Sequence, residues 1–142
     1  MIGLWALLGA LAVAGVLAWW LRRREGRIST GRGGPANAGQ DLPEPVLAAL
    51  EPPAPVTLVQ ISTTFCAPCR QAKVLLSGLA GQVDGLRHVE LDVTDQPEVA
   101  SRLGVLRTPT TLALDPGGRE LLRVGGVPSR DSLLDALRPH LP

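Results

Sequence analysis

The only two cysteines of this 142-residue chain, Cys66 and Cys69, stand three positions apart. A short loop precedes the cysteines, and the residues before that loop, Val56 to Ser62, are typical of a strand that is buried on both faces. From Cys66 to about Ala80, apolar residues recur at helical spacing. A strand that delivers a Cys-x-x-Cys pair to the start of a helix constrains the fold more than any other feature, and it predicts thiol–disulfide exchange.

Two further elements follow the predicted helix. Leu86 to Val93 is predicted as a strand, because apolar residues alternate with polar ones. Asp95 and Glu98 fit a capping box with Pro97 in the first turn, which predicts a short helix through Leu103. The first two strands must then be parallel and joined by a right-handed crossover.

The last part of the chain is predicted to form a hairpin and a helix. Thr110 to Leu114 and Glu120 to Val124 form the hairpin, with Asp115 to Gly118 as its turn. Ser129 caps the last helix, and Pro139 ends it. The predicted order of elements is therefore β-α-β-α-β-β-α.

The N-terminal part is unlike the rest. Ile2 to Leu21 contains no charged residue, and a helix of that length spans about 30 Å, the thickness of the hydrocarbon core of a bilayer. Trp19 and Trp20 lie at its end, and five arginines follow by position 32. A cleaved signal peptide would carry its positive charge first and small residues at its end, so we expect an uncleaved single-span membrane anchor. By the positive-inside rule, the arginines place the following domain in the cytoplasm.

Three segments follow from these patterns: a transmembrane anchor at residues 1–21, a linker at 22–54 that is first basic and then rich in proline and glycine, and a folded domain at 55–142. Such a linker buries little apolar surface, so we expect it to be mobile or extended. Within it, Pro45 to Leu50 is predicted to form a short helix that lies on the domain. The net charge of +1 provides no basic stripe for nucleic acid.

Three landmarks in order resemble the thioredoxin family over about residues 55–140: Phe-Cys-Ala-Pro-Cys at 65–69, Thr-Pro-Thr at 108–110 and Gly-Gly at 125–126. The resemblance implies an α/β, thioredoxin-like fold of βαβ–α–ββα order, with a central mixed sheet flanked by helices, here preceded by one transmembrane helix. It also implies that Cys66 is the exposed attacking thiol and Cys69 the resolving thiol. The unpaired N–H groups at the start of the helix also favour a thiolate at Cys66.

The same resemblance implies which residues contact substrate: Phe65, Ala67, Pro68, Thr108, Pro109 and Gly125. Pro109 matches a cis-proline that faces the cysteines, which would leave the backbone of Thr108 free to pair with an extended substrate chain. Gly125 and Gly126 match small residues that leave room for that substrate.

Some positions depart from the pattern of the family. Phe65 stands where tryptophan is usual, and Gln60 stands where a buried aspartate helps to deprotonate the resolving thiol. A glutamine cannot act as a base. Glu90 matches the usual lysine partner of that aspartate, so the candidates for proton transfer are Gln60 and Glu90, with Glu90 as the alternative acceptor and a solvated strand-end glutamate as the other interpretation. These departures favour a specialised member of the family.

A zinc site would need two ligands besides the cysteines, and His88 and His140 lack the spacing for it. We expect His88 to face solvent and His140 to lie at a fraying terminus. No metal and no organic cofactor are expected, because the redox-active disulfide Cys66–Cys69 itself carries the electrons.

The sequence thus predicts a membrane-tethered oxidoreductase that reduces protein disulfides and is recycled by a separate electron donor or reductase. Two alternatives remain open. One is a thiol reductase or oxidant outside the cytoplasm, of the type that serves cytochrome maturation or disulfide repair. The other is an adaptor that keeps the fold without catalysis.

Overall fold

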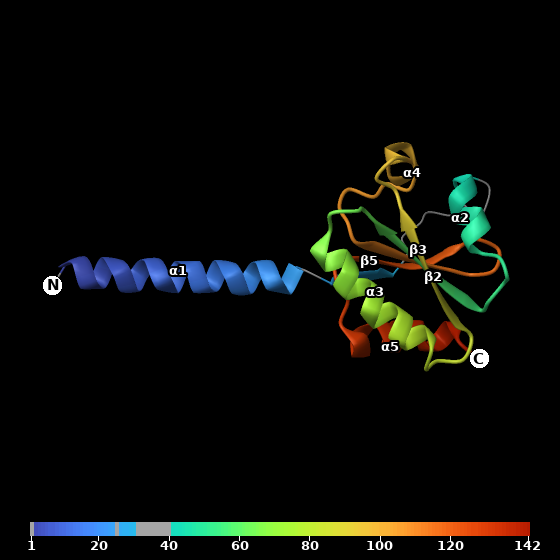
Figure 1. Cartoon of the computed structure of the whole chain (residues 1–142). Helices are drawn as coiled ribbons and strands as arrows, with labels where there is room; N and C mark the ends of the chain where they lie inside the picture. Colours follow the sequence, from blue (N-terminus) through green and yellow to red (C-terminus); the bar gives the residue numbers. More distant parts are fainter. Residues whose placement is uncertain (1, 25, 31–40) are drawn as a thin grey trace.

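The computed structural model describes residues 2–24, 26–30 and 41–142 (Figure 1). The helices are α1 (Ile2–Arg24), α2 (Glu44–Ala49), α3 (Ala67–Ala80), α4 (Pro97–Arg102) and α5 (Arg130–Leu137), with a 3-10 turn η1 (Arg138–His140) after α5. The strands are β1 (Ile28–Thr30), β2 (Val56–Ser62), β3 (Leu86–Asp92), β4 (Thr110–Leu114) and β5 (Glu120–Gly125). The order predicted for the folded domain is confirmed from β2 to α5.

The strands form one mixed sheet in the order β1-β5-β4-β2-β3. β2 and β3, which α3 connects, are parallel, whereas the other neighbouring strands are antiparallel. Gln60 in the centre of β2 lies opposite Glu90 on β3 and opposite Thr111 on β4. Every residue of β2 is buried, so the prediction of a strand covered on both faces is confirmed.

Helices cover both faces of the sheet and form two cores (Figure 1). α3 and α5 pack on one face, called the α3 face below, around residues such as Leu58 and Leu76. α2 and α4 pack on the other, the α2 face, around Ile61 and Leu112. Because side chains alternate along a strand, Gln60 lies on the same face as Leu58 and therefore beneath α3.

The segment predicted as a linker contains two docked elements. β1 pairs with β5, with Ile28 opposite Val124. α2 confirms the short helix predicted at this place and buries Val46 and Ala49 against the α2 face. The sequence does not predict β1, because three residues carry too little alternation to indicate a strand. The expectation of a mobile or extended linker is therefore wrong for β1, while its residues 31–40 lie outside the described part of the chain.

Of the two predicted helix caps, one is misplaced and the other lies where it was predicted. The N-cap of α4 is Gln96 rather than Asp95, and its side chain makes no capping hydrogen bond. Proline forces the residue before it away from the helical conformation, which moves the boundary of the helix to Gln96 and prevents the capping box. Ser129 does occupy the N-cap of α5, although without a side-chain hydrogen bond.

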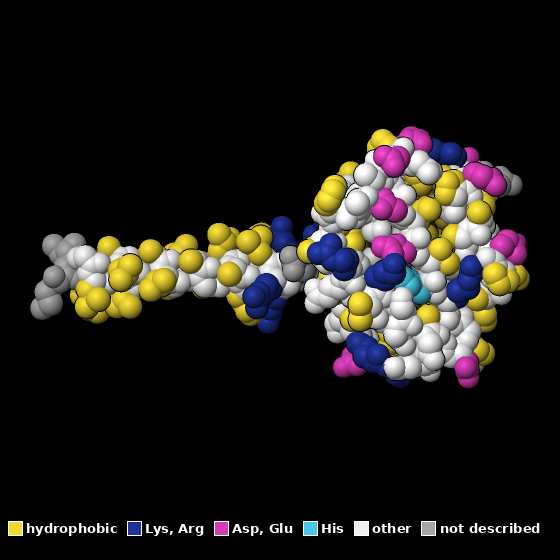
Figure 2. All heavy atoms as spheres, viewed as in Figure 1, with side chains coloured by type: hydrophobic (Ala, Val, Ile, Leu, Met, Phe, Trp, Pro, Cys, Tyr) yellow, Lys and Arg dark blue, Asp and Glu magenta, His cyan; other side chains and the backbone are white. Residues whose placement is uncertain are grey.

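α1 extends three residues beyond the predicted apolar run, to Arg24. Its residues Gly3–Arg24 are long and apolar enough to cross a membrane, and an 18-residue stretch within them has a mean hydropathy of 2.0 and is not buried against the domain. Figure 2 shows hydrophobic side chains along this helix and basic ones at the end nearest the domain. The guanidinium carbons of Arg23 and Arg24 lie 3.9 and 3.4 Å from the ring centroids of Trp19 and Trp20. A signal sequence has similar length and hydropathy, so α1 is a candidate span.

Candidate functional site: the disulfide and the polar network beneath it

The two cysteines meet at the first turn of α3. β2 ends at Ser62, and a short loop leads to Cys66, which is the extended N-cap of the helix rather than its first helical residue. Pro68 is tolerated in that first turn, where its missing N–H has no helical partner. Cys66 and Cys69 form a disulfide, with their Cα atoms 5.2 Å apart.

Both cysteines are largely covered. Cys66 is 8% exposed and Cys69 is 2% exposed, so Cys66 is the more accessible of the two but less open than predicted. The Cys69 N–H donates a hydrogen bond to Cys66 Sγ at 3.2 Å. In the reduced protein, this N–H and the positive end of α3 favour a thiolate on Cys66 over one on Cys69.

The loop before β4 lies beside the loop that leads to the disulfide. The Thr108–Pro109 peptide bond is cis, as the resemblance implied. Thr108 Oγ1 lies 3.3 Å from Thr63 Oγ1 in the loop before Cys66. In the described part of the chain, no backbone–backbone hydrogen bond involves Thr108. Pairing of its backbone groups with an extended substrate chain stays a prediction.

Two apolar side chains in the loops that lead to the disulfide and to the cis-proline are almost fully exposed. Phe65 directly precedes Cys66, and Leu106 lies two residues before Thr108; each is 98% exposed. Large apolar side chains in this position are available to contact another molecule. Phe65 was among the predicted substrate contacts, whereas Leu106 was not.

The room predicted beside Gly125 is occupied by a side chain of the same chain. Arg107 Nη2 donates to the Gly125 carbonyl at 3.0 Å. A Cβ added at Gly125 would lie 3.0 Å from the same nitrogen. A side chain at position 125 would therefore have to displace the Arg107 guanidinium slightly, and a substrate that approached Gly125 would meet the same guanidinium. In the sequence, this contact is visible only as an arginine two residues before the cis-proline. The fold decides that the side chain of this arginine points to Gly125.

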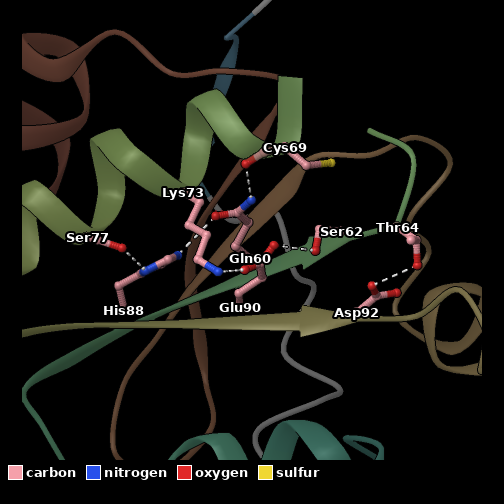
Figure 3. A network of polar contacts seen from close by, with 9 residues as sticks. All are labelled: Gln60, Ser62, Thr64, Cys69, Lys73, Ser77, His88, Glu90 and Asp92. Carbon is pink, nitrogen blue, oxygen red and sulfur yellow. Dashed lines mark hydrogen bonds and ion pairs between the residues drawn. The ribbon is translucent and has the colours of Figure 1, made fainter. Parts of the chain in front are cut away.

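A chain of hydrogen bonds runs beneath α3 (Figure 3). Gln60 is fully buried, and its Nε2 donates to the Cys69 carbonyl at 2.8 Å. Gln60 Oε1 lies 3.0 Å from His88 Nε2, and His88 Nδ1 lies 3.0 Å from Ser77 Oγ. A carbonyl oxygen only accepts, so the amide nitrogen of Gln60 faces Cys69 and its oxygen faces His88. It follows that His88 carries a proton on Nε2, which it donates to Gln60 Oε1.

The prediction that His88 faces solvent is wrong. His88 and Glu90 are two residues apart on β3, so both lie on the α3 face. Burial lowers the pKa of His88, the Glu90 carboxylate raises it and the Lys73 ammonium lowers it, and the resulting pKa lies below the ordinary value. Because this pKa lies below the ordinary value, the neutral imidazole is the form present at neutral pH, with its proton on Nε2 and Nδ1 accepting from the Ser77 hydroxyl.

Glu90 is held by two partners. Its Oε2 lies 2.6 Å from Lys73 Nζ, and its Oε1 accepts from Ser62 Oγ at 2.9 Å (Figure 3). Partial burial raises the pKa of Glu90, but the hydrogen bonds from Lys73 and Ser62, with the charge of Lys73, outweigh this effect and leave the pKa below its ordinary value. Within the described residues, neither Gln60 nor Glu90 hydrogen-bonds to a cysteine sulfur. A role for either residue in proton transfer stays a prediction.

Sequence reasoning did not single out Lys73, Ser77 or Arg107. All three are ordinary surface types, and only the folded chain places them against Glu90, His88 and Gly125. Among residues 2–24, 26–30 and 41–142, no group of three or more His, Cys, Asp or Glu side chains is placed to hold a metal ion.

Comparison with known proteins agrees with this geometry. The family model described as Thioredoxin matches residues 47–139. A thioredoxin of Staphylococcus saprophyticus is 31% identical over 87 residues, which cover 61% of this chain and 83% of that protein. The SPbeta prophage-derived thioredoxin-like protein YosR of Bacillus subtilis is 37% identical over 83 residues, which cover 57% of this chain and 98% of that protein.

Among solved structures, that of a mutant thioredoxin from Halobacterium salinarum superposes with a TM-score of 0.56 at 25% identity, over 63% of this chain and 77% of that one. The family model spans well over half of the chain and includes both cysteines and the cis-proline. The chain therefore belongs to the thioredoxin family, and with its Cys66–Cys69 pair it is a thiol–disulfide oxidoreductase.

Proposed function

We propose that this chain is a membrane-tethered oxidoreductase that reduces disulfides in proteins. The observation that carries the proposal is the Cys66–Cys69 disulfide at the start of α3, beside the Thr108–Pro109 loop. The tether is supported by α1, whose 23 residues extend for about 35 Å. The arginines after α1 favour a cytoplasmic position for the domain.

In the reduced protein, the Cys66 thiolate attacks a substrate disulfide and forms a mixed disulfide with one substrate sulfur. Cys69 then loses its proton and attacks Cys66 Sγ, which releases the substrate as a dithiol and restores the Cys66–Cys69 bond. Two electrons pass to the substrate from the cysteine pair itself, so a separate reductase or electron donor must reduce that pair again. The residues proposed to contact substrate are Phe65, Ala67, Pro68, Thr108, Pro109 and Gly125, with Arg107 over the last.

The reduction potential of the full chain in mild detergent tests the direction of electron flow. After equilibration with dithiothreitol, a value near about −270 mV would support a reductant, whereas one near about −120 mV would indicate an oxidant and contradict the proposal. If the Cys66–Cys69 bond formed at no potential, the non-catalytic adaptor would be favoured.

Mixed disulfides test the roles of the two cysteines. The Cys69→Ser variant should trap substrate proteins on Cys66, because the resolving step is lost. The matched Cys66→Ser variant should trap far less. Protease treatment of intact cells tests the position of the domain, which should be protected if it is cytoplasmic. A mature protein that lacked residues 1–21 would contradict the tether.

A further inference from the structure

We infer that the junction with α1 holds the disulfide end of the domain against the bilayer surface, so that the substrate is a disulfide in the membrane-proximal segment of an integral membrane protein. This inference rests on the proposed tether and on thiol–disulfide exchange by the Cys66–Cys69 pair.

The chain docks on the domain almost at once after α1. The Gly26 N–H donates to the Gly125 carbonyl at 3.0 Å. Only one residue separates Gly26 from Arg24, the last residue of α1, so the two Cα atoms are at most about 7.6 Å apart. The stretch rich in glycine and proline lies after β1, between two docked elements, and adds no length between the anchor and the domain.

This docking is part of the fold. Gly26 has a φ of 72°, which favours glycine, and a Cβ at this position would lie 2.7 Å from the Val127 carbonyl oxygen. β1 then continues along β5, and Ile28 packs against the core of the α3 face. The first residues after the anchor are thus held by a close backbone contact, a strand pairing and a half-buried side chain.

The docking point lies beside the catalytic loops. Gly126, next to the carbonyl that binds Gly26, donates its N–H to the Pro109 carbonyl at 2.7 Å. The neighbouring Thr108 contacts the loop before Cys66, through Thr63. In Figure 1, the first turn of α3 lies on the side of the domain from which α1 leaves, and its last turn lies farther from α1. A helix of 14 residues extends for about 21 Å, so the two ends of the domain differ clearly in their distance from the anchor.

The surface at this end suits a partner that emerges from a membrane. Positions 22–32 contain five arginines and one glutamate, and the exposed Arg107 adds a further guanidinium beside Gly125. Arginines next to the end of a membrane-spanning helix attract the anionic headgroups of lipids. The exposed Phe65, next to Cys66, and the exposed Leu106, two residues before Thr108, offer apolar contacts. A substrate segment that has just left the bilayer reaches this end directly, whereas a disulfide far from the bilayer has to enter the gap between domain and membrane.

The experiment uses the full chain, reduced beforehand and placed in liposomes that contain anionic lipid. Two synthetic single-span peptides act as substrates, one with its disulfide about five residues from the apolar segment and one with a flexible spacer of about 40 residues in between. In a single turnover, two electrons pass from Cys66 and Cys69 to either peptide disulfide. We expect the near disulfide to be reduced at least about tenfold faster, because its effective concentration at Cys66 is higher.

Two variants of the junction test the cause of that preference. A flexible spacer of about 20 residues inserted between Arg24 and Gly26 should remove the preference. Gly26→Val should weaken it, since the side chain cannot fit against Val127. Reduction of soluble insulin serves as the control and should be unchanged in both variants if the domain remains folded.

Each outcome has a separate meaning. Equal rates for the two peptides, or a preference that survives the spacer, would overturn the inference while leaving the oxidoreductase intact. Loss of insulin reduction in the unmodified chain would overturn the proposed function itself. A chain that does not float with the liposomes would overturn the tether and this inference together.

Discussion

The two faces of the central sheet use the same strands but differ in chemistry. On the α2 face, the core is aliphatic throughout and consists of Val46, Ala49, Leu50, Val59, Ile61, Val93, Val99, Leu103, Leu112 and Leu114. On the α3 face, β2 changes from Leu58 to Gln60 and β3 changes from Leu86 to His88 as the strands approach the disulfide. The α2 face also carries polar side chains, since Arg87 donates to the carbonyls of Ala49, Glu51 and Pro52. The hydrogen bonds to the helix turn that holds the cysteines come from the α3 face, where Gln60 donates to the Cys69 carbonyl.

β4 shows the same change on the α3 face. Thr111 lies opposite Gln60, and its Oγ1 is buried without a hydrogen-bond partner among the described residues. An unpaired buried hydroxyl costs stability. The polar end of the α3 face is thus a place where the fold gives up stability, which is typical of functional sites.

The largest effect should come from the aliphatic face. Leu112→Ala removes a fully buried side chain and should lower the free energy of unfolding by about 2–5 kcal/mol. Urea unfolding of the full chain in detergent measures it. The reduction potential should stay unchanged, and a clear shift in it would contradict the division between the two faces.

Gln60→Ala should have a smaller effect on stability but a clear effect on chemistry. It leaves the Cys69 carbonyl and His88 Nε2 without their partner, at a cost of about 1–3 kcal/mol. Because the first turn of α3 loses a contact, we also expect a changed reduction potential. Val59→Ala, next to Gln60 in sequence but on the α2 face, is the control and should alter stability alone.

His88→Gln should change how stability depends on pH. Burial lowers the pKa of His88 in the folded protein. When the pH falls below the ordinary value of about 6.5, the unfolded chain therefore binds more protons than the folded protein does. The stability from neutral His88 is complete above that pH and is lost as the pH falls through it. Unfolding at pH 7.5 and 5.5 should therefore show a weaker pH dependence in the variant, and an unchanged slope would contradict the neutral His88.

Lys73→Ala should have the smallest effect. The Lys73–Glu90 pair is partly exposed, and such pairs contribute about 0–1 kcal/mol. Without Lys73, the pKa of Glu90 should rise toward its ordinary value, which a carboxyl NMR titration would show. Arg138→Ala breaks a more exposed pair with Asp135 and is the control; it should leave the Glu90 titration unchanged.

Local sequence patterns predicted those parts of the site whose residues are neighbours in the chain. The strand, the Cys-x-x-Cys loop and the amphipathic α3 are neighbours in sequence, so their order and burial could be predicted from periodicity. The cap of α4 was misplaced because the effect of Pro97 on the residue before it outweighed the capping pattern. β1 was missed because a strand of three residues gains its stability from β5, which lies far away in sequence.

By itself, the sequence determined the cysteine pair at the start of a helix, the order of strands and helices from β2 to α5, and a long apolar helix at the N-terminus, since each depends on spacing within one short segment. Only the tertiary structure decided that His88 points beneath α3, that Arg107 lies over Gly125, and that Gly26 docks beside the catalytic loops. These contacts join segments far apart in the chain, and their energies come from burial and from hydrogen bonds that exist only after the sheet has formed.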